Sequence, residues 1–122
     1  MITESGFWTI VESTGFNKHK DYKIARKYIS RYFNQKDADV LRKKSKEFQA
    51  ILEVKIRHIE VNLGDDGMWD LLSTVVGLGR EVYYDICANP SKILNIDRVE
   101  NFDYCFTVET EGVEDVVVET LQ

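Results

Sequence analysis

The sequence predicts a mainly α-helical protein, with about five helices around one long central helix over residues 35–63. Apolar residues recur at spacings of three and four along most of the chain, which is the helical period. Capping residues precede several of these stretches, and Pro90, the only proline, follows the last one. With 122 residues, the chain can build one hydrophobic core. We therefore expect a single domain over residues 1–122, with a helical core over about 3–96 and an acidic C-terminal extension over 97–122.

Two helices are expected before the central one, over residues 4–13 and 20–33. Thr3 can cap the first, and Ile2 and Phe7 stand at the two positions of a hydrophobic staple. The second combines a stripe of tyrosine and aliphatic residues with many lysines and arginines. Because the tyrosines lie on that apolar stripe, we expect them to face the core, which argues against nucleic-acid binding by this basic segment.

The central helix is expected to start after Asn34, which can cap it, and to end at Gly64, which suits a left-handed C-cap. Its main apolar stripe consists of Leu41, Phe48, Leu52, Ile56, Ile59 and Leu63. A second stripe in the C-terminal half consists of Ile51, Val54 and Val61. A helix that is apolar on two faces is usually surrounded by other elements, so we expect this half to be the centre of the core.

Asp65 or Asp66 is expected to cap the next helix. The glycines of residues 77–79 interrupt the helical pattern, which resumes over residues 80–88. Residues 91–97 are expected to form a short turn or helix. The apolar residues that it would bury are Ile93, Leu94 and Ile96.

The C-terminal tail has a different pattern. Polar residues alternate there with Phe102, Tyr104, Phe106 and Val108, which is the period of a strand. Together with the valine run that follows, this segment would form a short C-terminal β-hairpin. A short helix over residues 113–120 is the alternative, and the sequence does not decide between the two.

The net charge of −5 hides a strong asymmetry between the two halves of the chain. Residues 1–57 hold 13 Lys and Arg against 7 Asp and Glu, a balance of +6. Residues 58–122 hold 3 against 14, a balance of −11, and the two balances together give the net charge. Charge balance is an argument about partners, so the acidic half predicts attraction to a basic protein and repulsion of nucleic acid.

The sequence predicts neither a membrane span nor a signal peptide. No apolar run approaches the length of about 18 residues that a span needs, and the opening Met-Ile-Thr-Glu-Ser lacks a basic segment followed by an apolar one. Cys87 and Cys105 are too few for a disulfide framework and form no metal-binding spacing. We therefore expect a cytoplasmic protein with two reduced core thiols.

Known catalytic and metal-binding patterns are absent from the sequence. It has no nucleophile elbow and no glycine-rich phosphate loop. His58 has no second histidine at helical spacing, and the Asp65–Gly67 run lacks the further oxygen ligands of a calcium loop. We therefore expect a protein without catalytic residues, bound metal or cofactor.

Three segments carry a resemblance to a known family. The first, Phe7-Trp8-Thr9-Ile10-Val11-Glu12, resembles the Phe-Trp-x-Leu-Ile-Glu opening of the bacterial domain of unknown function 4240. The second runs from Asp65-Asp66-Gly67-Met68 to Gly79-Arg80-Glu81-Val82-Tyr83 and is similar, without a gap, to that family's Ser-Asp-Asp-Gly-Phe and Gly-Arg-x-Val-Tyr segments. The third, Asn89-Pro90-Ser91, stands where the family has Asp-Pro-Asp. The resemblance spans about residues 3–94 and implies a small, mainly helical domain.

The chain departs from this family inside the second segment. Leu72 and Thr74 replace the family's Arg and Trp. An activity that depends on those two residues would therefore be lost or changed here, and the resemblance implies a fold rather than a reaction.

These observations predict a non-enzymatic protein-binding protein. The acidic half, the short chain and the absence of a catalytic pattern favour an immunity protein that neutralises a cognate basic toxin, for example a nuclease. The expected partner contacts are the acidic residues Asp65, Asp66, Asp70, Asp97, Glu100, Asp103, Glu109, Glu111, Glu114 and Asp115. The alternative is a small enzyme or ligand-binding regulator, with a pocket near His58, Arg80 and the aspartates Asp65, Asp66 and Asp70.

Overall fold

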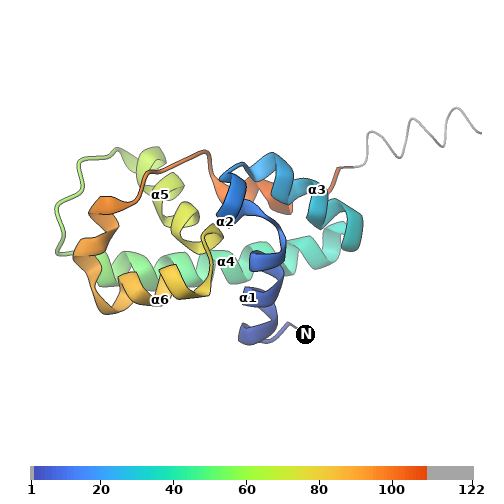
Figure 1. The fold of residues 1–122 in the computed structure, drawn as a ribbon, viewed down its shortest axis with the longest axis horizontal. Helices are drawn as coiled ribbons and strands as arrows, with labels where there is room; N and C mark the ends of the chain where they lie inside the picture. Colours follow the sequence, from blue (N-terminus) through green and yellow to red (C-terminus); the bar gives the residue numbers. More distant parts are fainter. Residues whose placement is uncertain (1, 110–122) are drawn as a thin grey trace, which may run out of the picture.

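The computed structural model describes residues 2–109 of the chain and shows a helical protein (Figure 1). This part of the chain contains six α-helices, two short 3-10 helices and no strand. They are α1 (Glu4–Ser13), α2 (Phe16–His19), α3 (Tyr22–Tyr32), α4 (Gln35–Ile56), α5 (Asp65–Gly77), α6 (Arg80–Ala88), η1 (Pro90–Asn95) and η2 (Phe102–Phe106). The predicted mainly helical fold is confirmed, with the short α2 as an addition.

Helix α4 is the longest element and runs along the helical body (Figure 1). Its 22 residues span about 33 Å at a rise of 1.5 Å per residue. α5, α6 and η1 pack on α4 toward its C-terminal half, whereas α3 lies near its other end. η2 packs against α3, α4 and α5 and so joins the two ends of the molecule. No helix within residues 2–109 is both long and apolar enough to cross a membrane.

Side-chain caps start α1 and α4, as the sequence predicts. The Thr3 hydroxyl accepts a hydrogen bond from the backbone N–H of Gly6 at 2.9 Å. The Asn34 side chain accepts one from the backbone N–H of Asp37 at 2.8 Å. Each cap satisfies a backbone donor that has no partner within its own helix.

The central helix is shorter than predicted, because it ends at Ile56 and not at residue 63. Exposed and half-buried residues alternate over residues 58–64, which is the two-residue period of an extended chain. The half-buried residues of this segment are Ile59, Val61 and Leu63. The left-handed C-cap predicted at Gly64 is also wrong, since Gly64 has a φ of −71° and directly precedes α5.

The second apolar stripe of α4 faces solvent. Ile51 and Val54 are 50% and 58% exposed. The buried residues of this helix share its other face: Ala38, Leu41, Ser45, Phe48, Gln49, Leu52 and Ile56. The prediction that neighbours surround the C-terminal half is therefore wrong, because the described elements cover one face of the helix only.

Helix α5 begins at Asp65 without a side-chain cap, so the cap predicted for Asp65 or Asp66 is wrong. Both carboxylates lie in the first turn instead, where the positive end of the helix dipole favours them. Seven consecutive residues at the other end of α5, residues 71–77, are buried. This helix therefore presents its polar N-terminal turns to solvent and its C-terminal turns to the core.

The predicted glycine break separates α5 from α6. Gly77 lies against the Phe16 ring, so that a Cβ atom there would stand 2.5 Å from a ring carbon. Gly79 has a φ of +110°, a conformation that glycine adopts without steric cost. The Glu12 carboxylate then accepts a hydrogen bond from the Arg80 backbone N–H at 2.9 Å and caps α6.

Two predictions for the C-terminal third are wrong. Leu94 is 60% exposed, although Ile93 is buried as expected. The strand predicted over residues 102–108 is the 3-10 helix η2 followed by irregular chain. The apolar side chains that η2 buries are Phe102, Cys105 and Phe106. Their spacing of three and four places them on one side of a helical turn, and they extend the core beyond residue 96.

Both alternatives for residues 113–120 lie outside the described residues.

Aromatic side chains form the centre of the core. The Trp8 ring lies 4.8 Å from that of Phe48 and 5.1 Å from that of Tyr83, measured between centroids. The Tyr83 hydroxyl donates a hydrogen bond to the Phe48 carbonyl at 2.7 Å. Burial raises the pKa of Tyr83 well above its ordinary value of 10.0. These contacts hold α1, α4 and α6 together.

Candidate functional site

The predicted partner contacts line different surface cavities. Asp66 and Asp70 line one surface cavity, Asp97 lines a second and Glu100 lines a third. Asp65 is exposed in the first turn of α5, next to Asp66. The acidic residues of this half therefore divide into separate groups, of which the one on α5 is the most compact.

Two further predicted contacts lie elsewhere. Glu109 lies beside α3, where its carboxylate is 3.8 Å from the guanidinium of Arg26. Its backbone N–H donates a hydrogen bond to the Ser30 hydroxyl at 2.7 Å. The remaining predicted contacts, Glu111, Glu114 and Asp115, lie outside the described residues.

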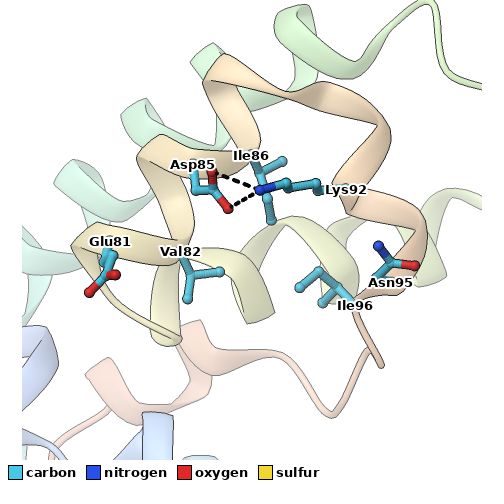
Figure 2. A pocket seen from close by; sticks show the side chains of 7 residues that line it. All are labelled: Glu81, Val82, Asp85, Ile86, Lys92, Asn95 and Ile96. Atoms are coloured by element: carbon cyan, nitrogen blue, oxygen red, sulfur yellow. Dashed lines mark hydrogen bonds and ion pairs between the residues drawn. The ribbon is translucent and has the colours of Figure 1, made fainter.

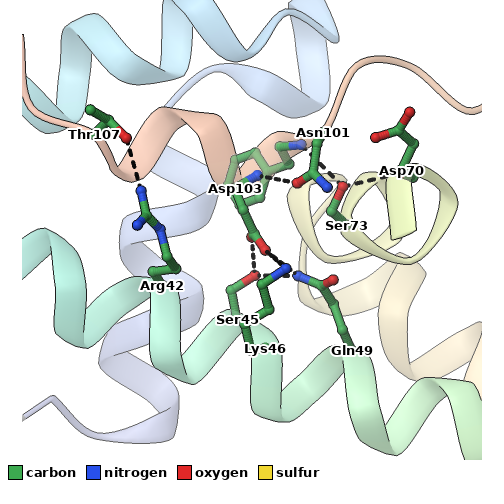
Figure 3. Close-up of polar contacts among 10 residues, drawn as sticks. Arg42, Ser45, Lys46, Gln49, Asp70, Ser73, Asn101, Asp103 and Thr107 are labelled. Atoms are coloured by element: carbon green, nitrogen blue, oxygen red, sulfur yellow. Dashed lines mark hydrogen bonds and ion pairs between the residues drawn. The ribbon is translucent and has the colours of Figure 1, made fainter. Parts of the chain in front are cut away.

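Asp103 is buried, so its predicted role as an exposed partner contact is wrong. Its carboxylate accepts hydrogen bonds from the Ser45 hydroxyl at 2.6 Å and the Gln49 amide at 2.7 Å. The Lys46 ammonium lies 3.1 Å from the same carboxylate (Figure 3). These donors compensate for the water that a buried carboxylate loses, and they connect η2 to α4.

The surface cavity that Asp66 and Asp70 line lies next to the buried carboxylate of Asp103. It has a volume of about 520 Å³, and we call it the aromatic–acidic hollow. Its lining residues are Lys46, Asp66, Trp69, Asp70, Asn101 and Tyr104. Because Lys46 both lines the hollow and pairs with Asp103, the polar network of Figure 3 forms one of its walls.

Helix α5 supplies half of the lining residues from a single face. Asp66, Trp69 and Asp70 are spaced by three and four, which places their side chains together on a helix. Trp69 is 40% exposed, and Tyr104, contributed by η2, is 55% exposed. The hollow is thus a polar depression that carries two large exposed aromatic side chains.

Neighbouring side chains hold these aromatic rings in place. The Lys46 ammonium lies 5.1 Å from the centroid of the Trp69 ring, which is a cation–π distance. The Tyr104 ring meets the Tyr22 ring edge to face at 5.3 Å. Contacts of this kind limit the rotamers that the rings can adopt and make the surface partly preorganised.

The two carboxylates of the hollow have different surroundings. Asp70 has an Arg98 guanidinium nitrogen at 3.8 Å. Asp66 is exposed and makes no ion pair with any residue of the described chain. Asp66 is therefore the carboxylate that can accept a new basic partner without breaking an existing pair.

His58 and Arg80, predicted members of a ligand pocket, do not join this hollow. His58 is exposed in the turn after α4, and Arg80 begins α6, at the opposite end of α5 from Asp66. The 13 residues of α5 separate these ends by about 18 Å. Within residues 2–109, no three His, Cys, Asp or Glu side chains are placed to hold a metal ion together.

Another surface cavity, of about 490 Å³, lies between α6 and η1 (Figure 2). Its lining residues are Glu81, Val82, Asp85, Ile86, Lys92, Asn95 and Ile96. The Lys92 ammonium stands 2.9 Å from the Asp85 carboxylate. Among the described residues, this ion pair leaves Glu81 as the unpaired carboxylate of the cavity, which has no aromatic residue in its lining.

Trp69 and Tyr104 are site residues that the sequence does not predict. Trp69 lies at the edge of the apolar stripe of α5, next to Asp66 and Asp70, and a large aromatic residue beside two aspartates was the signal for it. The sequence pattern predicts a strand at Tyr104. Only the turn geometry of η2 shows that this side chain is exposed.

No protein-family model, curated protein or solved structure matches this chain. The resemblance to the domain of unknown function 4240 therefore stays a prediction, and a function has to be argued from the chemistry of the hollow.

Proposed function

We propose that this protein is a non-enzymatic binding protein that takes a basic protein partner at the aromatic–acidic hollow. More specifically, we propose an immunity protein that neutralises a cognate basic toxin, for example a nuclease. The observation that carries the proposal is the pair of exposed aromatic side chains, Trp69 and Tyr104, beside the carboxylates of Asp66 and Asp70.

The aromatic residues support a protein interface. Trp and Tyr are enriched among the few residues that contribute most of the binding free energy in such interfaces. Trp69 and Tyr104 remain 40% and 55% exposed, so a partner could bury a large apolar area on them. Their contacts with Lys46 and Tyr22 reduce the entropy that they would lose on binding.

The charge supports a basic partner. Asp65 and Asp66 are exposed at the N-terminal end of α5. The sequence from residue 58 onward carries a charge balance of −11. Complementary charge accelerates association and disfavours acidic competitors, and its effect weakens as salt rises. A cationic enzyme surface, such as one that binds nucleic acid, has the complementary chemistry.

The test uses the product of a toxin-like gene adjacent to this one, titrated calorimetrically against the full chain. Trp69→Ala should weaken binding about 30-fold, the effect of a hot spot worth about 2 kcal/mol. Asp66→Asn should weaken it less and reduce its salt dependence. Val54→Ala is the matched control, because Val54 is 58% exposed on α4, outside the hollow.

Two results would count against the proposal. One is the absence of binding to any adjacent gene product, together with no basic protein copurifying from the native host. The other is equal binding by the Trp69→Ala and Val54→Ala variants, which would place the interface elsewhere. Metal in equimolar amount in the purified protein would instead favour a ligand-binding protein.

A further inference from the structure

A second charged surface lies on α2, α3 and the start of α4. Residues 16–36 contain seven Lys and Arg and a single acidic residue, Asp21, so they alone account for a balance of +6. The basic residues that are exposed there are Lys18, Lys20, Lys23, Lys27, Arg31 and Lys36. Among the described residues, none of these six pairs with a carboxylate, and Arg26 alone of the segment does. We call this surface the basic face.

Exposed tyrosines accompany these charges. The prediction that the tyrosines of this helix face the core is wrong for Tyr32, which is 60% exposed. Its ring lies 4.9 Å from the ring of Tyr28, which is itself half-buried. The Arg31 guanidinium stands 5.6 Å from the Tyr32 centroid. The Tyr32 ring is therefore accessible to a ligand.

The charges and the rings form two adjacent rows along α3. Lys23, Lys27 and Arg31 are spaced by four residues, so they follow one another along one side of the helix, about 6 Å apart. Tyr28 and Tyr32 are spaced in the same way and occupy the next positions in the chain. Consecutive residues of a helix lie about 100° apart around its axis, so a ligand that lies between the two rows meets the cations on one side and the exposed Tyr32 ring on the other.

We propose that the basic face binds single-stranded nucleic acid, with phosphates along Lys23, Lys27 and Arg31 and a base stacked on Tyr32. Cationic side chains that follow the backbone, together with aromatic rings that accept bases, are the two elements of single-strand recognition. The stacking is tolerant of sequence because every base has an aromatic face. None of the six cations lines the aromatic–acidic hollow, although Tyr22 at the start of α3 contacts Tyr104 of the hollow. The inference does not depend on the function proposed for the hollow.

The observations favour this ligand over an anionic membrane. A helix that lies on a membrane inserts a wide apolar face between the lipids. The apolar face of α3 is not available, because Ala25 and Ile29 are fully buried in the core. An acidic polymer without bases would pair with the lysines and arginines, but it would have no group to stack on the exposed Tyr32 ring.

The experiment measures fluorescence anisotropy of a labelled oligo(dT) of about 15 nucleotides with the full chain at low salt. Binding should weaken as salt rises. Tyr32→Ala should weaken it about tenfold, whereas Tyr32→Phe should keep it, because stacking needs the ring and not the hydroxyl. Lys27→Gln should weaken binding and lower the salt slope by about 0.7, the single-strand value for one phosphate contact.

Two variants control for charge and for aromatic exposure. Lys55→Gln removes an exposed lysine at the far end of α4, and Tyr84→Ala removes an exposed ring of α6. Both should bind the oligonucleotide as the unchanged protein does. Urea midpoints of all variants, compared with that of the unchanged protein, separate loss of binding from loss of folding.

Competition decides between the ligands. Inorganic polyphosphate at equal phosphate concentration should displace the oligonucleotide poorly, because it has no bases to stack. The proposal is overturned if polyphosphate competes equally and Tyr32→Ala has no effect. It is also overturned if vesicles of anionic lipid bind and the oligonucleotide does not, or if no binding appears even at low salt.

Discussion

At the scale of single residues, the buried carboxylate of Asp103 joins η2 to α4 through Ser45, Lys46 and Gln49. A negative charge inside a helical protein is costly unless donors replace its water, and here the donors come from one face of α4. The arrangement also determines the position of Lys46, which lines the hollow. The stability of the fold and the shape of the site therefore share these residues.

We predict that Asp103→Ala lowers the free energy of unfolding by about 1–3 kcal/mol, because it leaves buried donors of Ser45 and Gln49 without their acceptor. Urea unfolding followed by circular dichroism measures the change. Asp97→Ala is the control, since Asp97 is exposed, and its effect should stay within about 0.5 kcal/mol. Equal midpoints for the two variants would show that the network adds no stability.

We predict that Gly77→Ala destabilises the protein by about 1–3 kcal/mol through overpacking. The added Cβ would stand 2.5 Å from the Phe16 ring and 2.8 Å from that of Phe102, both of which are fully buried and cannot move away cheaply. Gly64→Ser is the control, because no atom lies within 4 Å of a Cβ there and the hydroxyl can cap α5. Thermal unfolding should show a lowered midpoint for the first variant only.

At the scale of the elements, local signals identified the starts of α1 and α4, but not the cap of α5 or the end of α4. Thr3 and Asn34 cap their helices as predicted, since a cap depends only on residues within one turn. The end of α4 at Ile56 was missed, although the alternation of Ile59, Val61 and Leu63 with polar residues was visible in the sequence. Ile59 and Leu63 also fit the main helical stripe and Val61 fits the second one, so the pattern alone did not exclude a helix.

We predict that Asn34→Ala lowers the free energy of unfolding by about 1 kcal/mol, because the Asp37 N–H loses its acceptor at the start of the longest helix. Asn34→Asp should retain most of the stability, since a carboxylate also caps and favours the helix dipole. Urea denaturation of both variants measures the difference. An aspartate variant as unstable as the alanine variant would contradict a capping role.

At the scale of the whole molecule, opposite charges occupy different parts of the fold. The basic face follows α2, α3 and the start of α4. The aromatic–acidic hollow lies between α4, α5 and η2. The two halves also meet, since Glu109 pairs with Arg26 of α3 and Glu100 lines a cavity together with Lys20 and Lys23. Each surface has exposed aromatic residues that the charge count does not show. Charge and aromatic exposure together support the two binding proposals.

We predict that stability falls as the pH rises above about 9–10. Burial raises the pKa of the Cys105 thiol well above 9.0 and that of Tyr83 well above 10.0. The unfolded chain then releases these protons at a lower pH than the folded chain, so stability that is fully present below the unfolded pKa values is lost as the pH rises from them toward the folded pKa values. Urea unfolding at a series of pH values up to about 11 measures this loss.

The matched variant for this prediction is Cys105→Ala, which removes one of the two buried acids. Its stability should fall less steeply over the same pH range, even though its absolute stability at neutral pH is lower because of the cavity. An unchanged slope would show that burial of Cys105 does not contribute to the alkaline sensitivity.

The sequence by itself determined the helical class, the caps at Thr3 and Asn34, the glycine break before α6 and the division of charge. These features depend on residue type and on neighbours within one or two turns, which a sequence displays directly. Only the tertiary structure decided that η2 is helical, that Asp103 is buried, and that Tyr32, Trp69 and Tyr104 are exposed. A periodic pattern identifies the apolar side of a segment, but whether another element covers that side depends on contacts between distant parts of the chain.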